Sequence, residues 1–443
     1  MRRLKIHFGA LILLLTLLWW LADPGALLNT SGFFPWRGLA VQYLGLLAFG
    51  LMSAAMILAV RPAWLECRLG GLDKMYRLHK WLGLGGLGLA VAHWLAAQGP
   101  KWLVQAGVLT RPVRGAAREQ SSAILQFFQS QRGQAEAIGE WAFYAVIAII
   151  AVALIKSFSY KAFFRMHRLV SVAYLVLVAH SVVLVRFDYW ASPLSLAVTG
   201  LAFGGTVSAI LAVTGKIGNG RKSNGRVEEV NKRPEAGLVE IVLTVDEKWP
   251  GHLSGQFAFV TFHAKEGAHP YTITSNWCND GRLTFLIKGL GDYTNTLAET
   301  VKTGDRAIVE GPYGCFNFEG RSARQIWVGG GIGVTPFLAR MRELAQHSDG
   351  CEVDFYHTTA AVEEETFRRL QAEAEAAGIR LHILVDSRDG FLSGERLRRE
   401  IPDWQAADIW FCGPAKFGQV LCKDLTAHGC PEERFHQELF EMR

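Results

Sequence analysis

The chain divides into an apolar first half and a second half of mixed polarity. Six apolar runs precede Lys216, and each is long enough to cross the roughly 30 Å hydrocarbon core of a bilayer as a helix. The runs cover residues 6–22, 41–60, 78–97, 138–155, 169–185 and 194–213. This pattern predicts a six-helix membrane domain over residues 1–215.

The charges beside these runs predict their orientation. Two short loops are basic, one with Arg61, Arg68, Lys74, Arg77 and Lys80, the other with Lys156, Lys161, Arg165 and Arg168. Cytoplasmic loops of membrane proteins carry such an excess of Lys and Arg. We therefore expect an integral protein of the inner (cell) membrane with both termini in the cytoplasm. Its first run is expected to be a retained helix and not a cleaved signal peptide.

The predicted outer loop over residues 98–137 departs from that pattern. Its charged residues are Lys101, Arg111, Arg114, Arg118, Glu119, Arg132 and Glu136, so basic residues outnumber acidic ones. One interpretation is an ordinary solvated loop. The other is a basic outer surface that attracts an anionic molecule.

The second half contains two further patterns after a polar, glycine-rich linker over residues 216–225. Strand-like alternation predicts a small antiparallel β-barrel within residues 226–322, with strands over 238–245, 256–262 and 282–288. From residue 325, buried strands alternate with helices, which predicts a parallel sheet covered by helices over residues 323–443. The expected fold is therefore multidomain: a transmembrane helix bundle, an antiparallel barrel and an α/β domain.

Composition narrows the function. The net charge of +6 forms no basic stripe with interleaved aromatic residues, so nucleic acid is not expected as a partner. The seven cysteines are Cys67, Cys278, Cys315, Cys351, Cys412, Cys422 and Cys430, all in segments predicted to be cytoplasmic. They lack Cys-x-x-Cys spacing, which argues against zinc and iron–sulfur sites and fits reduced thiols.

Four histidines lie at matched depths on two predicted helices. His79 and His93 are 14 residues apart, and His167 and His180 are 13 apart, so each pair spans roughly 20 Å along its helix. Facing helices would present His79 to His167 near the cytoplasmic face and His93 to His180 near the outer face. The alternative is four histidines satisfied by backbone carbonyls, but their matched depths favour two bis-imidazole haem sites.

The sequence also bears on how the haems would be attached and on how the second helix presents its two histidines. No Cys-x-x-Cys-His sequence is present, so we expect non-covalent, b-type haems. Thirteen residues turn an α-helix to a face about 140° away. Either the second helix is overwound, or its two rings approach their irons from different azimuths.

A glycine-rich turn lies between a predicted strand and a predicted helix. Glycines let backbone N–H groups approach a phosphate, and the helix N-terminus favours negative charge. The strand–turn–helix context therefore predicts dinucleotide binding, although the turn differs from the G-x-G-x-x-G fingerprint. The residues concerned are Gly329, Gly330, Gly331, Gly333, Thr335 and Pro336.

Five motifs, taken with the histidines, resemble one known family. The motifs occupy residues 269–275 (His-Pro-Tyr-Thr-Ile-Thr-Ser), 287–294 (Ile-Lys-Gly-Leu-Gly-Asp-Tyr-Thr), 310–314 (Glu-Gly-Pro-Tyr-Gly), 329–336 and 411–414 (Phe-Cys-Gly-Pro). Their order and form are similar to those of ferric reductases and NADPH oxidases. In that family, a ferric reductase-like transmembrane domain is fused to a ferredoxin–NADP reductase-type FAD and NAD(P) module. The histidine spacings match the haem-ligating pattern of the same family.

The resemblance implies roles for individual residues. Tyr271 would lie against the isoalloxazine ring, with the Thr272 hydroxyl near its redox-active nitrogen. His269 and Lys288 would face the FAD phosphates, and Gly291 and Thr294 would line the pyrophosphate. The remaining flavin-motif residues are Pro270, Thr274 and Ser275, and the second nicotinamide segment is Cys412, Gly413 and Pro414.

One aromatic residue near the C-terminus completes the implied site. Phe440 resembles the aromatic that covers the flavin until nicotinamide displaces it, although an ordinary core role is the alternative. The resemblance therefore implies that Thr272, Cys412 and Phe440 lie at the site of hydride transfer.

The implied activity is an NAD(P)H-dependent flavohaem oxidoreductase that passes electrons from NAD(P)H through FAD and two haems to an acceptor outside. A ferric chelate is the leading acceptor, because no histidine follows His93 by one helical turn as in family members specialised for dioxygen. The alternatives are a superoxide-generating oxidase, reduction of a periplasmic or quinone partner, and a non-enzymatic haem-binding scaffold or sensor. Arg388 fits either a 2′-phosphate contact or a solvated turn, which leaves NADH and NADPH both open.

Overall fold

The computed structural model describes the whole chain except residues 1, 111–122, 156–159, 321, 361 and 439–443. It divides into two compact units. The first contains residues 1–63 and 75–217, and the second contains residues 64–74 and 218–443. The segment 64–74 therefore packs with the second unit, although it connects two helices of the first.

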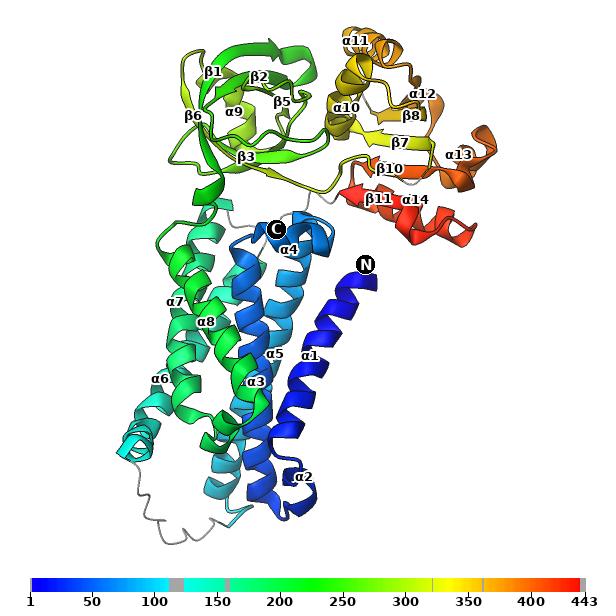
Figure 1. The fold of residues 1–443 in the computed structure, drawn as a ribbon. Coiled ribbons are helices and arrows are strands. Elements are labelled where there is room, and N and C mark those ends of the chain that lie inside the picture. The colour runs from blue at the N-terminus through cyan, green and yellow to red at the C-terminus, as the bar shows by residue number, and fades with distance from the viewer. Residues whose placement is uncertain (1, 111–122, 156–159, 321, 361, 439–443) are drawn as a thin grey trace. The chain divides into compact units, whose positions relative to one another are not determined.

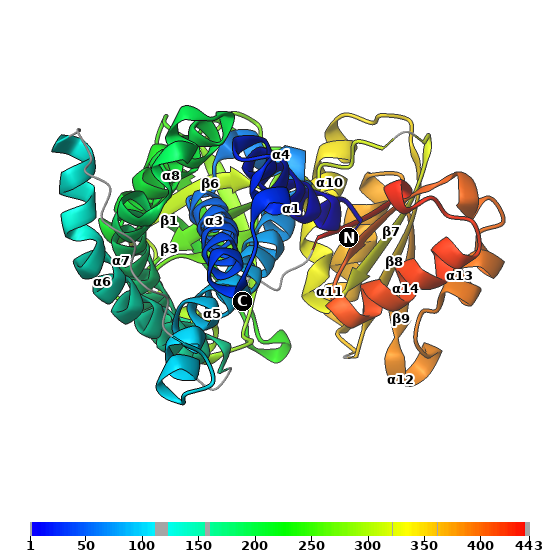
Figure 2. The same ribbon diagram turned by 90° about the horizontal axis from the view of Figure 1, so that it is seen from below.

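The first unit is a bundle of long helices (Figures 1 and 2). Its elements are α1 (Arg2–Ala22), α2 (Ala26–Asn29), α3 (Phe33–Ala59), α5 (Leu72–Gln105), α6 (Ala123–Leu154), α7 (Tyr160–Leu184), η1 (Phe187–Ala191) and α8 (Pro193–Val213). Five of them, α1, α3, α6, α7 and α8, are long and apolar enough to cross a membrane. The predicted run over residues 78–97 lies inside α5, which is long enough but less apolar than the other five, so the count of six spans stays a prediction.

The helix α5 continues through Pro100 because another helix replaces the hydrogen bond that proline removes. Proline has no N–H, so the carbonyl of Ala96 one turn earlier loses its partner in the helix. Arg37 of α3 donates from Nε to the Ala96 carbonyl at 3.1 Å and from Nη2 to the Ala97 carbonyl at 2.8 Å. The guanidinium thus satisfies the helix at the point where it would otherwise break.

The second unit begins with a six-stranded antiparallel sheet in the order β4-β3-β6-β1-β2-β5. The strands are β1 (Lys222–Arg233), β2 (Leu238–Val245), β3 (Phe257–Thr261), β4 (His269–Thr272), β5 (Arg282–Lys288) and β6 (Arg306–Tyr313). Residues 222–225, predicted as linker, lie in β1 because all four pair with β6, and Gly225 also pairs with β2. A bridge between Ile273 and Phe285 joins the two ends of the strand order, so the sheet closes as the predicted barrel. Helix α9 (Asp292–Thr300) packs Leu297 into its core.

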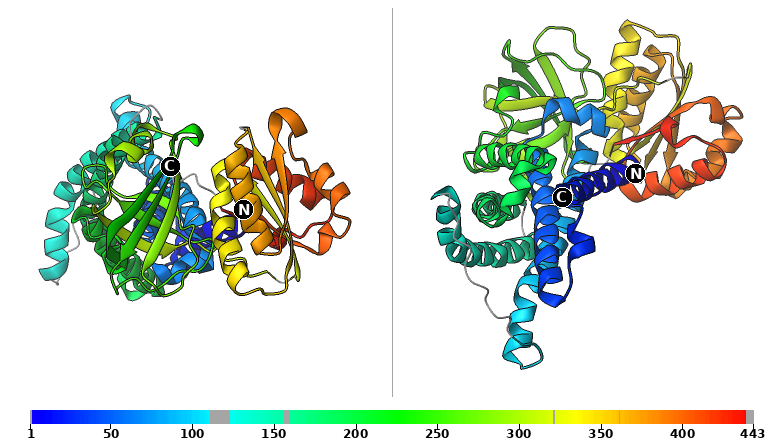
Figure 3. Two further views of the ribbon diagram at one scale, coloured as in Figure 1. Left: turned by 90° about the horizontal axis from the view of Figure 1, so that it is seen from above. Right: turned by 60° about the horizontal axis from the view of Figure 1, so that its bottom comes forward.

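The remaining strands form a five-stranded parallel sheet in the order β11-β10-β7-β8-β9. Helices lie on both faces of this sheet (Figure 3). The strands are β7 (Arg324–Gly330), β8 (Glu352–Thr359), β9 (Arg380–Val385), β10 (Asp408–Cys412) and β11 (Phe435–Glu438). The accompanying helices are α10 (Thr335–Gln346), α11 (Glu364–Ala376), α12 (Asp386–Asp389), α13 (Gly394–Glu400) and α14 (Ala415–Ala427). The chain proceeds outward from β7 to β9 and then returns to β10 on the other side of β7. The order therefore reverses between β7 and β10, where α/β sheets bind ligands at the carboxyl ends of their strands.

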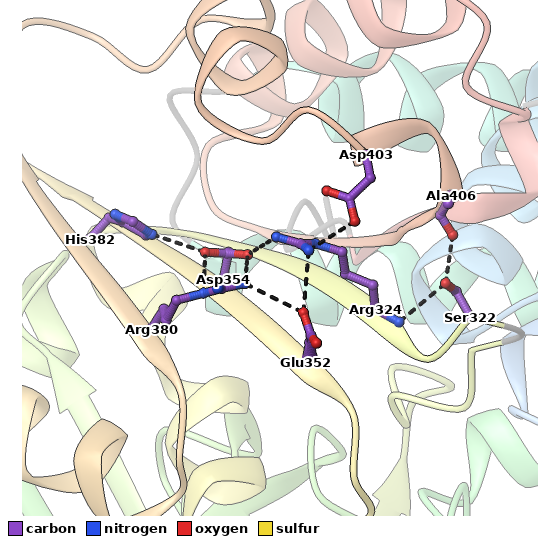
Figure 4. A network of polar contacts seen from close by, with 8 residues as sticks. All are labelled: Ser322, Arg324, Glu352, Asp354, Arg380, His382, Asp403 and Ala406. Atoms are coloured by element: carbon purple, nitrogen blue, oxygen red, sulfur yellow. Dashed lines mark hydrogen bonds and ion pairs between the residues drawn. The ribbon is translucent and has the colours of Figure 1, made fainter.

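A polar cluster joins the opposite, amino-terminal ends of β7, β8 and β9 (Figure 4). Its centre is the buried carboxylate of Asp354, which accepts hydrogen bonds from Arg324 at 2.8 Å, Arg380 at 3.0 Å and His382 at 3.2 Å. Burial alone would raise the pKa of Asp354, but these donors outweigh it and lower the pKa to about 2. The cluster lies away from the predicted nucleotide site and stabilises the sheet.

We expect Asp354→Asn to lower the free energy of unfolding of this unit by about 2 kcal/mol at pH 7. The carboxyl has a lower pKa folded than its ordinary 3.8, so its contribution is full above pH 4 and disappears as the pH falls through 2. Urea unfolding of the full chain should show the deficit shrinking to about half at pH 3. Asp403→Asn, which removes an exposed partner of Arg324, should change stability by less than about 0.5 kcal/mol. Equal effects of the two substitutions would contradict the assignment.

Candidate functional site

The four predicted histidines of the first unit lie in two facing pairs. His79 and His167 have ring centres 5.9 Å apart, and His93 and His180 have ring centres 6.4 Å apart. Two imidazoles bound to one metal through nitrogen at about 2.0 Å would place their ring centres about 6.2 Å apart. Both pairs therefore have the separation that a shared iron requires.

Three of these rings are oriented by backbone carbonyls. The Nδ1 atoms of His79, His93 and His180 each lie 2.8 Å from a carbonyl oxygen, those of Ala55, Val41 and Ala135 respectively. A ring that donates from Nδ1 keeps its lone pair on Nε2, the atom then available to a metal. Hydrogen bonding to carbonyls, the alternative to haem ligation in the sequence, is thus compatible with ligation by the other nitrogen.

Two glycines make room for these hydrogen bonds, and sequence reasoning did not identify them. A side chain four residues after a carbonyl lies over that carbonyl on a helix. Gly45 stands four residues after Val41, and a Cβ there would lie 3.0 Å from the His93 ring. Gly139 stands four residues after Ala135, and a Cβ there would overlap the His180 ring. The detectable signal is a glycine within an apolar helix, which has no meaning until the facing histidine is known.

The spacing of 13 residues in α7 is accommodated without overwinding. The helix is α-helical throughout its described length from Tyr160 to Leu184. His167 and His180 therefore approach their partners from different azimuths. Within the described residues no group of three or more His, Cys, Asp or Glu side chains is placed to hold a metal ion.

In the second unit, the predicted flavin segments meet beside the barrel. The His269 ring of β4 stacks on Tyr293 of α9 with ring centres 4.6 Å apart, and on Tyr271 at 6.4 Å. Within the described residues, the buried hydroxyl of Tyr271 has no hydrogen-bond partner. Burial raises the pKa of that phenol, so the hydroxyl stays protonated. A buried polar group of this kind fits the binding of a polar ligand.

Several predicted flavin residues already use their hydroxyl groups within the protein. Thr274 donates to the Thr284 carbonyl at 3.0 Å, and Ser275 accepts from the Thr284 N–H at 3.1 Å, so both hold the barrel closed. Thr294 accepts from the N–H groups of Leu290 and Gly291 at 2.9 and 3.1 Å, which shapes the start of α9. Their contribution to a cofactor site is thus to position the backbone around it. Pro270 and the buried Thr272 lie on β4, and Lys288 ends β5.

The two predicted nicotinamide segments lie side by side at the reversal of the parallel sheet. Gly329 of β7 is paired with Cys412 of β10. A Cβ on Gly330 would lie 2.8 Å from Pro414, and a Cβ on Gly333 would overlap the carbonyl of Cys412. Gly331 has φ +57°, a conformation that favours glycine. The turn continues into α10, where the hydroxyl of Thr335 donates to the Ile332 carbonyl at 3.1 Å and Pro336 occupies the first turn.

Cys412 and Phe440, two of the predicted hydride-transfer residues, stay predictions. Cys412 is fully buried, and burial raises the pKa of its thiol, so it is a neutral group beneath the surface of the site. Phe440 lies outside the described residues.

Two buried groups near these segments were not predicted. His357 of β8 is paired with Gly329, and burial lowers its pKa to about 4, so the ring is neutral at pH 7. Glu438 of β11 is paired with Cys412, and burial raises the pKa of its carboxyl well above the ordinary value. Within the described chain its Oε2 atom has no hydrogen-bond partner. Neither residue stands in a motif that its local sequence would reveal.

Comparison with known protein families gives two matches. Residues 44–178 match the family described as ferric reductase like transmembrane component, a range that includes His79, His93 and His167. Residues 226–317 match an FAD-binding domain family, a range that includes the segments around Tyr271 and Lys288.

The chain is also similar, at low sequence identity, to several curated proteins and solved structures. The chain is 26% identical over 185 residues to a glycine betaine monooxygenase reductase subunit of Chromohalobacter salexigens, covering 38% of this chain and 50% of that protein. It is 27% identical over 166 residues to a flavohemoprotein of Halalkalibacterium halodurans, covering 34% of this chain and 40% of that protein. The FAD/NAD-binding domain of a Vibrio cholerae nitric oxide dioxygenase is similar at a TM-score of 0.42 with 21% identity, covering 49% of this chain and 98% of that domain. The chain spans about half the length of the first of these relatives.

Proposed function

Because the chain carries a ferric reductase-like transmembrane domain followed by an FAD-binding module of the ferredoxin–NADP reductase type, we propose that it is a transmembrane oxidoreductase. It takes electrons from NAD(P)H on the cytoplasmic side and delivers them across the inner membrane to an acceptor outside. Its acceptor is ferric iron in a chelate. The observation that carries the proposal is the geometry of the two facing histidine pairs in the domain that precedes the reductase module. In each pair, the distance between the ring centres is the one that binding to a shared iron requires.

The two units bind different cofactors. His79 with His167 and His93 with His180 hold two b-type haems, and the Ala55, Val41 and Ala135 carbonyls keep three of the rings with Nε2 available. When bound, FAD accepts a hydride and releases its electrons singly, and haem iron carries single electrons.

The reductase unit orients the other two cofactors. Tyr271 and Thr272 lie on β4, where they hold the isoalloxazine ring, and the start of α9 with Lys288 receives the phosphates. Gly329 to Gly333 and the Cys412–Pro414 segment bring two strand ends close enough for the nicotinamide nucleotide to lie across them.

The surroundings of His93 favour a chelate over dioxygen. Trp94 follows the ligand, stacks on Phe143 at 5.7 Å and donates to Glu140 at 3.3 Å. The position one turn beyond His93 is Ala97, whose carbonyl accepts from Arg37. No histidine is therefore present at that turn to assist dioxygen reduction. Dioxygen is the second candidate, because a reduced haem near the outer surface transfers electrons to it slowly.

The test is anaerobic reduction of the purified full-length protein by NADPH or NADH, followed in the visible spectrum. Ferric citrate and dioxygen are then added to separate samples. We expect fast haem reoxidation by the chelate and slow reoxidation by dioxygen. Fast reoxidation by dioxygen with superoxide release would identify an oxidase, and flavin that NAD(P)H never reduces would indicate a haem-binding scaffold.

A variant tests the ligand assignment itself. His93→Ala should halve the haem content and abolish ferric citrate reduction, while NAD(P)H still reduces the flavin. His7→Ala, which changes an exposed histidine of α1, should leave haem content and activity unchanged. Unchanged haem content in His93→Ala would exclude this residue as a ligand.

A further inference from the structure

A buried carboxylate anchors the segment that connects α3 to α5 within the second unit. This segment contains the short helix α4 (Ala63–Leu69) and packs within the same compact unit as residues 218–443. Glu66 is only 4% exposed, and its Oε1 atom accepts the N–H of Gly314 at 2.6 Å. Its Oε2 atom pairs with Arg221 at 3.3 Å. Arg221 in turn lies over the ring of Tyr313 at 4.6 Å, so the anchor is connected to the end of β6.

This anchor brings two cysteines together. Cys67 follows Glu66 and Cys315 follows Gly314, so the bond between Glu66 and Gly314 aligns the next residue on each side. The sulfur atoms of Cys67 and Cys315 lie 3.0 Å apart, although 248 residues separate them in the chain. Both thiols are free, with Cys67 exposed and Cys315 half-buried. A disulfide requires the sulfurs to approach to about 2.04 Å, a movement of about 1 Å.

Two glycines shape the turns beside this pair of cysteines. Gly314 has φ +103° and Gly71 has φ +118°, so both turns adopt conformations that other residues rarely take. A Cβ on Gly71 would lie 4.0 Å from the backbone nitrogen of Cys315. The N–H groups of Gly70 and Gly71 donate to the carbonyls of Cys67 and Glu66 at 3.1 and 3.0 Å, which fixes the end of α4 beside Cys315.

We propose that Cys67 and Cys315 are a redox-controlled cross-link, which a peroxide converts into a disulfide between the α3–α5 connection and the strand end after β6. The Cys67 thiolate attacks one peroxide oxygen, the O–O bond breaks, and the departing oxygen leaves as water after protonation. Cys67 is then a sulfenic acid. The Cys315 sulfur attacks the Cys67 sulfur, the S–O bond breaks, and the hydroxyl leaves with the Cys315 proton as a second water. Two thiols lose two electrons in total, and the peroxide gains them.

The surroundings assign different roles to the two thiols. Cys67 is exposed and can meet a peroxide from solution. Burial raises the pKa of the Cys315 thiol, which therefore stays protonated and reacts second, with the neighbouring sulfenic acid. Once formed, the disulfide fixes a segment that continues directly into α5, the helix carrying His79, onto the unit that carries the predicted flavin residues.

The experiment treats reduced full-length protein with hydrogen peroxide, alkylates the remaining thiols and digests it for mass spectrometry. We expect a peptide pair joined through Cys67 and Cys315 that dithiothreitol separates. Trypsin cleavage after Arg68 in the folded protein should slow at least about threefold on oxidation, because the cross-link holds α4 in place. Cys278→Ser, a matched change at another exposed cysteine of the same unit, should leave the cross-link intact.

Two variants distinguish the order of the steps. Cys315→Ser should accumulate a sulfenic acid on Cys67 that dimedone traps, whereas Cys67→Ser should give no trapped product at Cys315. The flavin and haem spectra of each variant report that it has folded. Two results would overturn the proposal. One is that folded parent protein gives no joined peptides after peroxide treatment, and the other is that its Cys67 is oxidised directly to sulfinic acid. None of these readouts depends on electron transfer, so their failure is distinct from failure of the proposed function.

Discussion

Replacing Gly139 with valine should remove the outer haem and leave the inner one. The new side chain would occupy the space of the His180 ring and displace it from the Ala135 carbonyl, to which its Nδ1 atom now hydrogen-bonds at 2.8 Å. Because a ligand ring must hold its orientation to bind a metal, the pair formed by His93 and His180 would lose one member. Haem content measured as the pyridine haemochrome should fall from two per chain to one.

A matched control lies on the same helix. Gly133 is also in α6, and a Cβ there meets nothing within 4 Å. Gly133→Val should therefore retain both haems, although it introduces the same residue type into the same helix. NAD(P)H should still reduce the flavin and the remaining haem in Gly139→Val, while electron delivery to ferric citrate ceases. Full haem content in Gly139→Val would show that His180 is not held as the structure places it.

Gly333→Ala should slow flavin reduction by NAD(P)H by roughly 100-fold while leaving the flavin bound. A Cβ at this position would overlap the carbonyl of Cys412, which belongs to β10, a strand paired on both sides, and cannot move aside as a flexible side chain would. The glycine-rich turn must therefore shift away from the segment Cys412–Pro414. A displacement of about 1 Å at a site of group transfer lowers the rate by roughly 100-fold.

Stopped-flow measurement of flavin reduction separates this effect from a general loss of structure. The variant should bind FAD in full, and dithionite should reduce flavin and haem as in the parent protein. Gly220→Ala, in the same unit and with nothing within 4 Å of the added Cβ, should reduce flavin at the parent rate. Flavin reduction by NAD(P)H at the parent rate in Gly333→Ala would contradict the placement of the nucleotide on this turn.

The elements themselves were largely predictable from the sequence, because each depends on local pattern. The strands over residues 238–245 and 282–288 have the predicted bounds, since alternation of apolar and polar residues directly reflects a half-buried strand. The antiparallel and parallel character of the two sheets also followed from how strands alternate with helices. Less local features were harder. Lys222 to Gly225 were predicted as linker because their composition is polar and glycine-rich, but pairing with the distant strand β6 makes them part of β1.

The candidate site likewise combines local features with features that depend on distant segments. The sequence was enough to identify the candidate residues: four histidines at matched depths, a glycine turn between strand and helix, and a flavin-type motif on a strand. The residues beside these candidates became known from the fold. Gly45 and Gly139, the buried carboxyl of Glu438 and the contact between Cys67 and Cys315 depend on segments far apart in the chain. The local sequence indicates the conformation and burial of its own segment. The neighbour that gives a glycine, carboxyl or thiol its role belongs to another segment, and the packing of the two segments determines which residue that neighbour is.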